Sequence, residues 1–339
     1  MKTKQLIITA VILFFCTLAT VAQDPVTTLQ HKGTTTLFYG IESFAQAVNA
    51  AVNNDTLYIQ ACTMNPPGLI TKKLYIVGAG HFLDSSNGRT VIAGGLTIGK
   101  GADSLHIEGL YIRDDINYES GSSINYVQIT RCRLNNASFN SSSATVSKNY
   151  CSFEECISNS IDFSGYGTNL LVRHCIINGR LSTINGSAII DGNVFIQQNY
   201  NLVNVFSSLI QNNIFCGQTG YGSITGVVSN FYSNNLFTAN AISFGQDSRD
   251  SNNYLGVSQV DIFVNQSGNS FDYTHDYHLK NPEKYIGTDG TQVGLYGGPI
   301  PFKEKGLPSN PQITSKSIAR QTDANGNLPV NITVKAQAN

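Results

Sequence analysis

Charged residues recur at one position of a repeated phrase, and their types could support acid–base chemistry. Glu154, Arg173 and Asp191 each follow an apolar residue that opens a copy of the phrase, and His174 comes directly after Arg173. A carboxylate, a base and a neutralising charge on adjacent strands could act on an acidic glycan, with Arg173 or His174 as the base. The alternative is a solvated ladder of ion pairs worth about 0.2 to 1 kcal/mol each. We prefer the ladder, because the charges alternate in sign and form no specific motif.

Two tyrosines are candidates for contact with a sugar. Tyr200 lies in an Asn-Tyr-Asn sequence and Tyr221 in a Gly-Tyr-Gly sequence, each three residues before an apolar residue that starts a predicted strand. If these turns stack, the rings lie about 5 Å apart and could face consecutive sugar units, while Asn199 and Asn201 supply hydrogen bonds. The alternative is that the rings pack only against each other. The absence of Trp from the chain slightly weakens the binding interpretation.

A third group of polar residues lies near the C-terminal end. Asp272, His275, Asp276 and His278 form the main concentration of His and Asp. Imidazole and carboxylate suit several divalent cations, but the spacing matches no ligand motif such as HExxH, and no CxxC pair indicates zinc. We therefore expect a polar closing loop here, and neither a metal site nor a cofactor.

A short repeated phrase must position these residues. It consists of an apolar residue, a small polar residue three positions later, and another apolar residue two positions beyond that. The copies recur every 18 to 24 residues, a period typical of a solenoid in which each unit stacks on the next. The small polar position is occupied in turn by Leu110, Cys132, Cys156, Cys175, Asn193, Asn213, Asn235 and, in a degraded copy, Asn253.

The segments between the copies indicate which solenoid this is. Runs such as Ile161-Asp162-Phe163 and Val203-Asn204-Val205 alternate with period two, which is typical of strands. The gaps are rich in Gly, Asn and Ser, which suit turns, and no regular Leu pattern indicates a leucine-rich repeat. The sequence therefore predicts an all-β parallel β-helix with about three short strands in each coil.

Stacked coils give the repeated position a physical meaning. Equivalent residues lie about 4.8 Å apart along the axis, so the asparagines should form a hydrogen-bonded ladder and Phe195, Phe215 and Phe237 an aromatic column. Three cysteines share one inward position with parallel Cβ directions, which suits disulfide formation badly. We therefore expect free, buried thiols rather than the disulfide framework that an even number of cysteines in an exported protein would suggest. The six cysteines beyond the predicted signal are Cys62, Cys132, Cys151, Cys156, Cys175 and Cys216.

Residues 1–22 have the features of an export signal. Lys2 and Lys4 precede an apolar stretch at residues 6–15, and small residues lie directly before Gln23. A membrane anchor is the alternative, but the stretch is short and no other segment reaches about 18 apolar residues. We therefore expect a secreted, periplasmic or cell-surface protein without a transmembrane segment. The 21 basic and 22 acidic residues nearly balance, so nucleic acid is not an expected partner.

The remainder of the chain divides into three parts. Residues 23–54 are expected to form an N-terminal cap, because residues 41–53 place apolar side chains at helical spacing. Residues 55–262 carry the β-helix. Residues 263–339 are expected to form closing loops and a tail, in which residues 328–334 alternate like a strand, either docked on the body or forming a small appendage.

The chain resembles the secreted right-handed β-helix proteins related to pectin and pectate lyases. The resemblance rests on NDTLYI at residues 54–59, on coils that end in Asn-Asn-apolar-Phe, and on DYHL, GTDG and GLYGG at residues 276–279, 287–290 and 294–298. The last three are similar to the closing segment of many such proteins from Gram-negative bacteria. The resemblance covers most of residues 34–300 and implies a right-handed solenoid with an N-terminal capping helix. It says little about activity, since such proteins include lyases, hydrolases and adhesins.

In the lyases and hydrolases that this chain resembles, three or four carboxylates usually cluster on one exposed strand face, often around calcium and with an Arg or Lys base. The corresponding column here contains one carboxylate, which is too few. We therefore predict a monomeric, non-catalytic protein that contacts polysaccharide, with a divergent polysaccharide lyase or glycoside hydrolase and a protein-binding adhesin as alternatives. The column is predicted to contain Asp162, Ser182 or Thr183, Asn204, Thr225 and Ser243.

Overall fold

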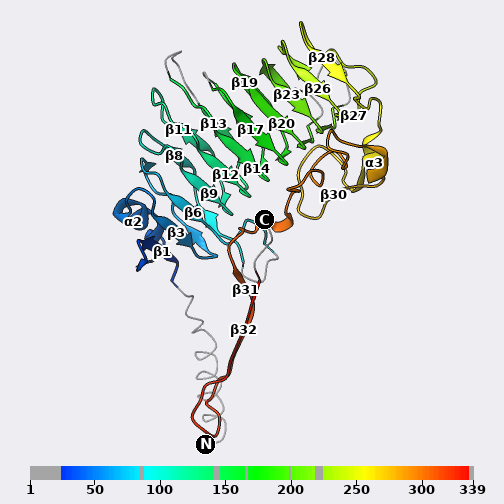
Figure 1. Ribbon diagram of the computed structural model, residues 1–339. Coiled ribbons are helices and arrows are strands. Elements are labelled where there is room, and N and C mark those ends of the chain that lie inside the picture. Colours follow the sequence, from blue (N-terminus) through cyan, green and yellow to red (C-terminus); the bar gives the residue numbers. More distant parts are fainter. Residues whose placement is uncertain are drawn as a thin grey trace, which may run out of the picture.

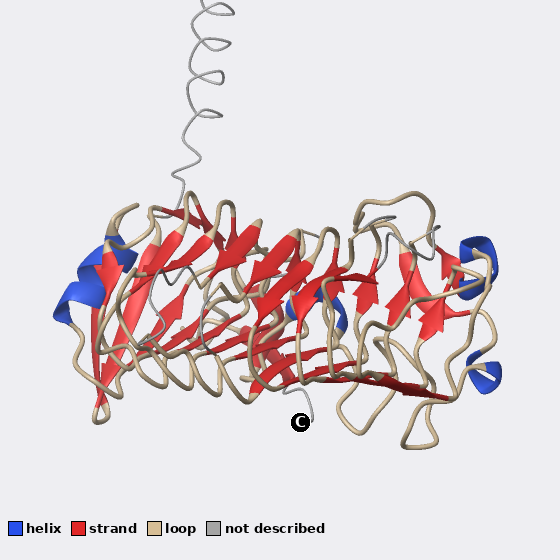
Figure 2. Cartoon of the chain, turned by 90° about the horizontal axis from the view of Figure 1, so that it is seen from above, coloured by secondary structure: helices blue, strands red, loops and turns tan. Residues whose placement is uncertain are grey.

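The chain forms a β-solenoid of about nine turns, built of mostly parallel sheets with very little helix. Figures 1 and 2 show the coils stacked one after another along a single axis. The predicted all-β parallel solenoid is therefore confirmed, whereas the predicted export signal lies outside the described residues. None of the helices in the described part of the chain is long and apolar enough to span a membrane. The computed structural model describes residues 24–83, 88–139, 146–164, 167–197, 200–217 and 224–335.

The first sheet carries the repeated phrase. Its central apolar residues point inward and pair with their equivalents in the next coil, as Ile129 does with Ile107 and Phe153. These side chains are fully buried, so the register expected from the phrase is confirmed. In spatial order the strands are β2 (Thr34–Tyr39), β1 (Val26–His31), β3 (Thr56–Ile59), β6 (Tyr75–Val77), β9 (His106–Glu108), β12 (Gln128–Thr130), β14 (Ser152–Glu154), β17 (Leu170–Arg173), β20 (Ala188–Asp191), β23 (Leu209–Gln211), β26 (Phe231–Ser233) and β28 (Arg249–Ser251).

The second sheet follows directly after the turn that holds the repeated polar position. It has two parts, which single-residue bridges at Arg133 join. Its strands are only two residues long, and in β18 Ile177 enters the inner core while Ile176 faces the opposite side. The strands are β4 (Thr63–Met64), β7 (Val91–Ile92) and β10 (Tyr111–Ile112) in one part, and β15 (Ile157–Ser158), β18 (Ile176–Ile177), β21 (Val194–Phe195), β24 (Ile214–Phe215) and β27 (Leu236–Phe237) in the other.

The third sheet closes each coil. Its parallel strands bury alternating apolar residues such as Ile161 and Leu181, which pair across neighbouring coils. The strands are β5 (Leu69–Ile70), β8 (Leu96–Ile98), β11 (Ile116–Tyr118), β13 (Asn136–Ser138), β16 (Ser160–Asp162), β19 (Leu181–Ile184), β22 (Leu202–Val205) and β25 (Ile224–Thr225).

The asparagine ladder forms as predicted in the turn between the first two sheets. From Asn213 onward, each amide oxygen accepts the backbone N–H and the side-chain amide of the preceding asparagine, as Asn235 does from Asn213 at 3.0 Å in both bonds. The amide oxygen of Asn193 accepts the backbone N–H of Cys175 at 2.8 Å. Each amide nitrogen also donates to a carbonyl oxygen of the preceding coil, which for Asn235 is that of Ile210 at 2.8 Å. The buried turn therefore has partners for polar groups that water cannot reach.

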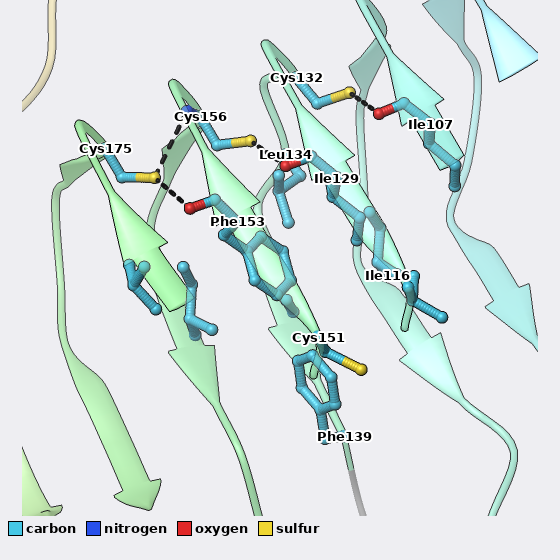
Figure 3. Packing of buried hydrophobic residues seen from close by; sticks show 14 of the residues in the cluster. Ile107, Ile116, Ile129, Cys132, Leu134, Phe139, Cys151, Phe153, Cys156 and Cys175 are labelled. Carbon is cyan, nitrogen blue, oxygen red and sulfur yellow. Dashed lines mark hydrogen bonds between the residues drawn. The ribbon is translucent and has the colours of Figure 1, made fainter. Parts of the chain in front are cut away.

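The cysteine column continues this ladder with sulfur in place of the amide. Figure 3 shows the side chains of Cys132, Cys156 and Cys175 pointing the same way on successive coils. The Cys175 thiol donates to the carbonyl oxygen of Phe153 at 3.4 Å and accepts the backbone N–H of Cys156 at 3.4 Å. All six cysteines of the described residues are free, so the prediction of unpaired thiols is confirmed. The aromatic column is confirmed too, because its neighbouring rings stack with centroids 4.7 Å apart.

The N-terminal end adds a helix and a hairpin to the coils. Helix α2 (Ser43–Ala50) buries Phe44, Ala47 and Val48 and contacts β1 and β3. It lies at the end of the stack where the chain enters the solenoid (Figure 1). The antiparallel hairpin of β1 and β2 extends the first sheet beyond β3, and the sequence analysis did not foresee it.

After β28 the chain reverses and runs back along the outside of the second sheet. We call residues 259–309 the strap. It contains helix α3 (Gln259–Ile262), strands β29 (Phe263–Asn265) and β30 (Asp276–Leu279), and the short 3₁₀ helices η1 (Pro282–Lys284) and η2 (Glu304–Gly306). Its apolar residues cover the outward residues of the second sheet and form a second hydrophobic core with them. This core explains why both residues are apolar in β18, β21, β24 and β27.

The tail forms a separate antiparallel hairpin of β31 (Gln312–Ile318) and β32 (Val330–Lys335). Figure 1 shows it projecting away from the coils. The residues of β32 are all exposed. The predicted strand at residues 328–334 is therefore present, in the form of an appendage.

Candidate functional site

A hollow of about 310 Å3 lies where the strap crosses the second sheet. We call it the aromatic hollow, because six aromatic rings line it together with one buried histidine. The ring of Phe82 packs edge-on against Tyr273 with centroids 4.5 Å apart, and Tyr273 packs in the same way against Phe271 at 4.9 Å. The lining residues used below are His81, Phe82, Phe271, Tyr273, Tyr277, Tyr296 and Phe302.

His81 is the buried polar group of this wall. The Tyr273 hydroxyl donates to the His81 carbonyl oxygen at 3.1 Å, so it accepts the Nδ1 proton of the same residue, 3.2 Å away. Nε2 therefore carries the lone pair, and it is buried without a hydrogen-bond partner among the described residues. Burial and the positive charges of Arg133 and Arg89 lower the pKa of His81 to about 3. The ring is thus neutral at ordinary pH, and the backbone of Gly306 packs against its Nε2 side.

Carboxylates at the rim of the hollow are already bonded within the strap. Asp272 accepts hydrogen bonds from the backbone N–H and the hydroxyl of Thr274, which lower its pKa. The backbone N–H of His278 likewise lowers the pKa of Asp276. A general acid at neutral pH needs a raised pKa. These two carboxylates therefore suit hydrogen bonding to a ligand better than proton transfer.

The strap gives the histidine and aspartate group of the sequence a definite place. Asp272, His275 and Asp276 line the hollow, while His278 stacks on the Tyr296 ring with centroids 3.7 Å apart. Within the described residues, no group of three His, Cys, Asp or Glu side chains could hold a metal ion. The sequence analysis had placed a polar closing loop here, and it missed the ring-lined hollow that this loop completes.

The predicted tyrosine site is only partly described. Tyr200 is 54% exposed in the turn before β22, as a ring that contacts a ligand would have to be. Asn201 is fully buried and donates to the carbonyl oxygen of Gln197 at 2.8 Å. Its amide therefore faces the turn rather than solvent. Tyr221 and Asn199 lie outside the described residues.

The charged residues of the phrase stack as predicted, but they do not all remain in solvent. Glu154 pairs in register with Arg173, and Arg173 with Asp191. Arg173 forms an ion pair with Glu154, while Asp191 accepts a hydrogen bond from Asn212 at 2.9 Å. His174 is buried beneath the strap, and this burial, together with the charge of Arg173, lowers its pKa to about 4.

The next position of the same turn carries a second ion-pair network, which was not expected from the sequence. Arg131 is buried between two buried carboxylates and bonds Glu155 through two nitrogens, at 2.9 and 3.2 Å, and Glu108 through a third, at 2.9 Å. Glu155 also accepts the backbone N–H of Lys303 at 2.8 Å, and Glu108 that of Ser309 at 3.0 Å. The network is buried because the strap covers it. The two hydrogen bonds from strap N–H groups in turn hold the strap against the coils.

The exposed column of the third sheet also needs correction. Asp162 pairs with Ser182, and Ser182 pairs with Val203. Asn204 was expected at this position, but it takes a left-handed φ of 55° and shifts the alternation by one residue. Ser243 lies outside the described strands. The column still contains one carboxylate in the described strands, and its members are Thr97, Asn117, Ser138, Asp162, Ser182, Val203 and Thr225.

Comparison of the chain with family models, with curated proteins and with solved structures found no match. The functional interpretation therefore rests on the geometry described above.

Proposed function

We propose that this is a secreted β-helix protein, related to the pectin and pectate lyase group, that binds a saccharide in the aromatic hollow without chemically changing it. The observation that carries the proposal is the set of six aromatic rings that line this hollow. Its volume of about 310 Å3 is at the lower end of the range for small-molecule sites. One sugar unit or a short segment of a chain fits such a space.

The chemistry of the walls suits a sugar. Sugar rings present C–H groups on their faces, which pack on aromatic rings, and hydroxyl groups at their edges. The carboxylates of Asp272 and Asp276 at the rim are acceptors for hydroxyl groups.

The geometry favours binding over catalysis. Hydrolysis of a glycosidic bond commonly needs one carboxyl group with a raised pKa to protonate the leaving group. The pKa values of Asp272 and Asp276 are lowered instead. The outward column of the third sheet holds one carboxylate in the described strands, which is one fewer than the acid and base pair of a glycosidase needs.

A glycan panel tests the proposal. Retention of the wild type on immobilised neutral and acidic polysaccharides would be compared with that of Phe82→Ala and Tyr296→Ala. We expect either variant to weaken retention about tenfold, since a stacked ring contributes about 0.5 to 1.5 kcal/mol beyond the area it buries. Tyr39→Ala, which removes an exposed ring of β2, is the matched control and should bind as the wild type does.

The same panel separates this site from the turn at Tyr200. Loss of retention in Tyr200→Ala, with unchanged retention in Phe82→Ala and Tyr296→Ala, would place the contact at the turn and contradict the proposal. Circular dichroism of each variant controls for folding. Appearance of cleaved or unsaturated products during the incubation would show that the protein is an enzyme.

A further inference from the structure

A second hollow, of about 240 Å3, adjoins the aromatic hollow. Both are lined by Ile157 and Phe271, so one ligand could extend from one into the other. The second hollow differs in chemistry, because Arg113, Arg133 and three asparagines line it. Its described lining contains no carboxylate. We call it the arginine hollow.

Arg133 is held in place by aromatic rings rather than by an acidic partner. Its guanidinium carbon lies 4.9 Å from the ring centroid of Tyr111, 4.7 Å from that of Tyr273 and 5.3 Å from that of Phe271. Among the described residues no carboxylate lies within ion-pair distance of Arg133 or Arg113. Rings on several sides fix the plane of the guanidinium of Arg133 and leave its charge uncompensated.

The positive charge of this region acts on its neighbours. It contributes to lowering the pKa of His81, after burial, and of Asp272, after the hydrogen bonds from Thr274. The carboxylates of Asp272 and Asp115 beside the arginine hollow are already hydrogen-bonded, Asp272 to Thr274 and Asp115 to Asn135 and Asn136. An anion entering the hollow would therefore find a positive potential and little competition.

We propose that the arginine hollow is an oxyanion subsite that takes a carboxylate or sulfate group carried by the saccharide in the aromatic hollow. The planar fork of Arg133 can donate two parallel hydrogen bonds to either group, and Arg113 adds charge from the rim. This inference rests on the proposed function and names the class of saccharide that the site prefers.

The test uses trisaccharides that share one backbone and differ in one substituent. Dissociation constants would be measured for a neutral galactose trimer, its galacturonate form and its 6-sulfated form. We expect one or both anionic trimers to bind about tenfold more tightly than the neutral trimer, and added salt to reduce this advantage. Preference for the carboxylate or for the sulfate identifies which group occupies the hollow.

Substitutions assign the preference to the arginines. Arg113→Gln, at an exposed residue, should remove most of the anionic advantage and leave neutral binding unchanged. The matched control is Arg249→Gln on β28, which removes the same charge from an exposed position elsewhere and should keep the preference.

Three outcomes separate the two proposals. If all trimers bind equally, and Tyr296→Ala abolishes binding while Arg113→Gln does not, the oxyanion subsite is wrong and the aromatic hollow remains. If Arg249→Gln removes the preference as Arg113→Gln does, the advantage comes from net charge and the subsite is again wrong. If no trimer and no polysaccharide of the panel binds, both proposals fail.

Discussion

Replacing Asn213 by Leu should leave polar groups of the asparagine ladder without hydrogen-bond partners. The amide oxygen of Asn213 accepts the backbone N–H of Asn193 at 2.9 Å, and its amide nitrogen donates to the carbonyl oxygen of Ile190 at 2.8 Å. The side chain is fully buried, so water cannot replace it. Each polar group left without a partner lowers the free energy of unfolding by about 1 to 3 kcal/mol, and burial of the more apolar Leu side chain offsets part of this loss. We expect the free energy of unfolding to fall by about 2 to 4 kcal/mol.

The cysteine column provides a graded comparison for this substitution. Because Cys175 makes the same two kinds of bond through sulfur, Asn213→Cys should keep weakened versions of both and cost on the order of 1 kcal/mol. Asn117→Leu, at an exposed position of β11, is the matched control and should cost little.

Urea unfolding, followed by circular dichroism, measures these differences. Midpoint and slope are both needed, because a solenoid can lose coils separately. Equal losses in Asn213→Leu and Asn117→Leu would refute the reasoning about the buried ladder. A loss in Asn213→Cys as large as that in Asn213→Leu would show that the thiol does not replace the amide.

Three further predictions concern buried polar groups. Arg131→Gln should lower the free energy of unfolding by about 3 to 5 kcal/mol, because it leaves two carboxylates buried without their partner; urea unfolding that shifts no more than in the exposed control Arg180→Gln would contradict this. His81 and His174 have folded pKa values of about 3 and about 4, below the unfolded value of about 6.5, so the stability they contribute is complete above about pH 6.5 and is lost as the pH falls toward 4. In the double variant with Gln at both positions, the urea midpoint should therefore fall less steeply over this pH range than in the wild type. Parallel plots of midpoint against pH for the two proteins would contradict the assignment of this pH dependence to the two histidines. The buried thiols of the cysteine column should resist alkylation in the native protein and react after unfolding without reductant; a disulfide-linked peptide in non-reduced mass spectrometry would disprove free thiols.

The parts of the fold that repeat could be predicted from the sequence. Stacking places the same position of each coil in the same surroundings, so the demand for a buried hydrogen-bonding group recurs as Asn193, Asn213 and Asn235. The ring column of Phe195, Phe215 and Phe237 follows for the same reason. A structural requirement that recurs in every coil selects the same type of residue in every coil, and this pattern is visible in the sequence.

The third sheet shows where periodicity misleads. The alternation of Val203-Asn204-Val205 suggested that Val203 points inward, whereas Leu202 is the buried residue that pairs with Ile224. The left-handed backbone of Asn204 adds one outward residue to the strand. Such a local irregularity reverses the face of the sheet to which the preceding side chains of the strand point.

The candidate site could not be predicted, because it joins distant parts of the chain. His81 and Tyr273 are 192 residues apart and meet through the strap, which has no repeat of its own. The aromatic residues of residues 271–302 were a signal that this segment packs against something, and the paired apolar residues of strands such as β21 were a signal that the second sheet is covered. Neither signal indicated where the two would leave a hollow.

The measurement that tests the central claim most directly is a fluorescence titration of Phe82→Trp. The chain has no Trp, so this variant carries a single reporter at the wall of the aromatic hollow. Titration with the saccharide retained best by the wild type should change its emission in a saturable way, while a reporter in Tyr39→Trp on β2 should not respond. Undiminished binding with unchanged emission from Phe82→Trp would show that the saccharide binds elsewhere, and would contradict the assignment of the aromatic hollow.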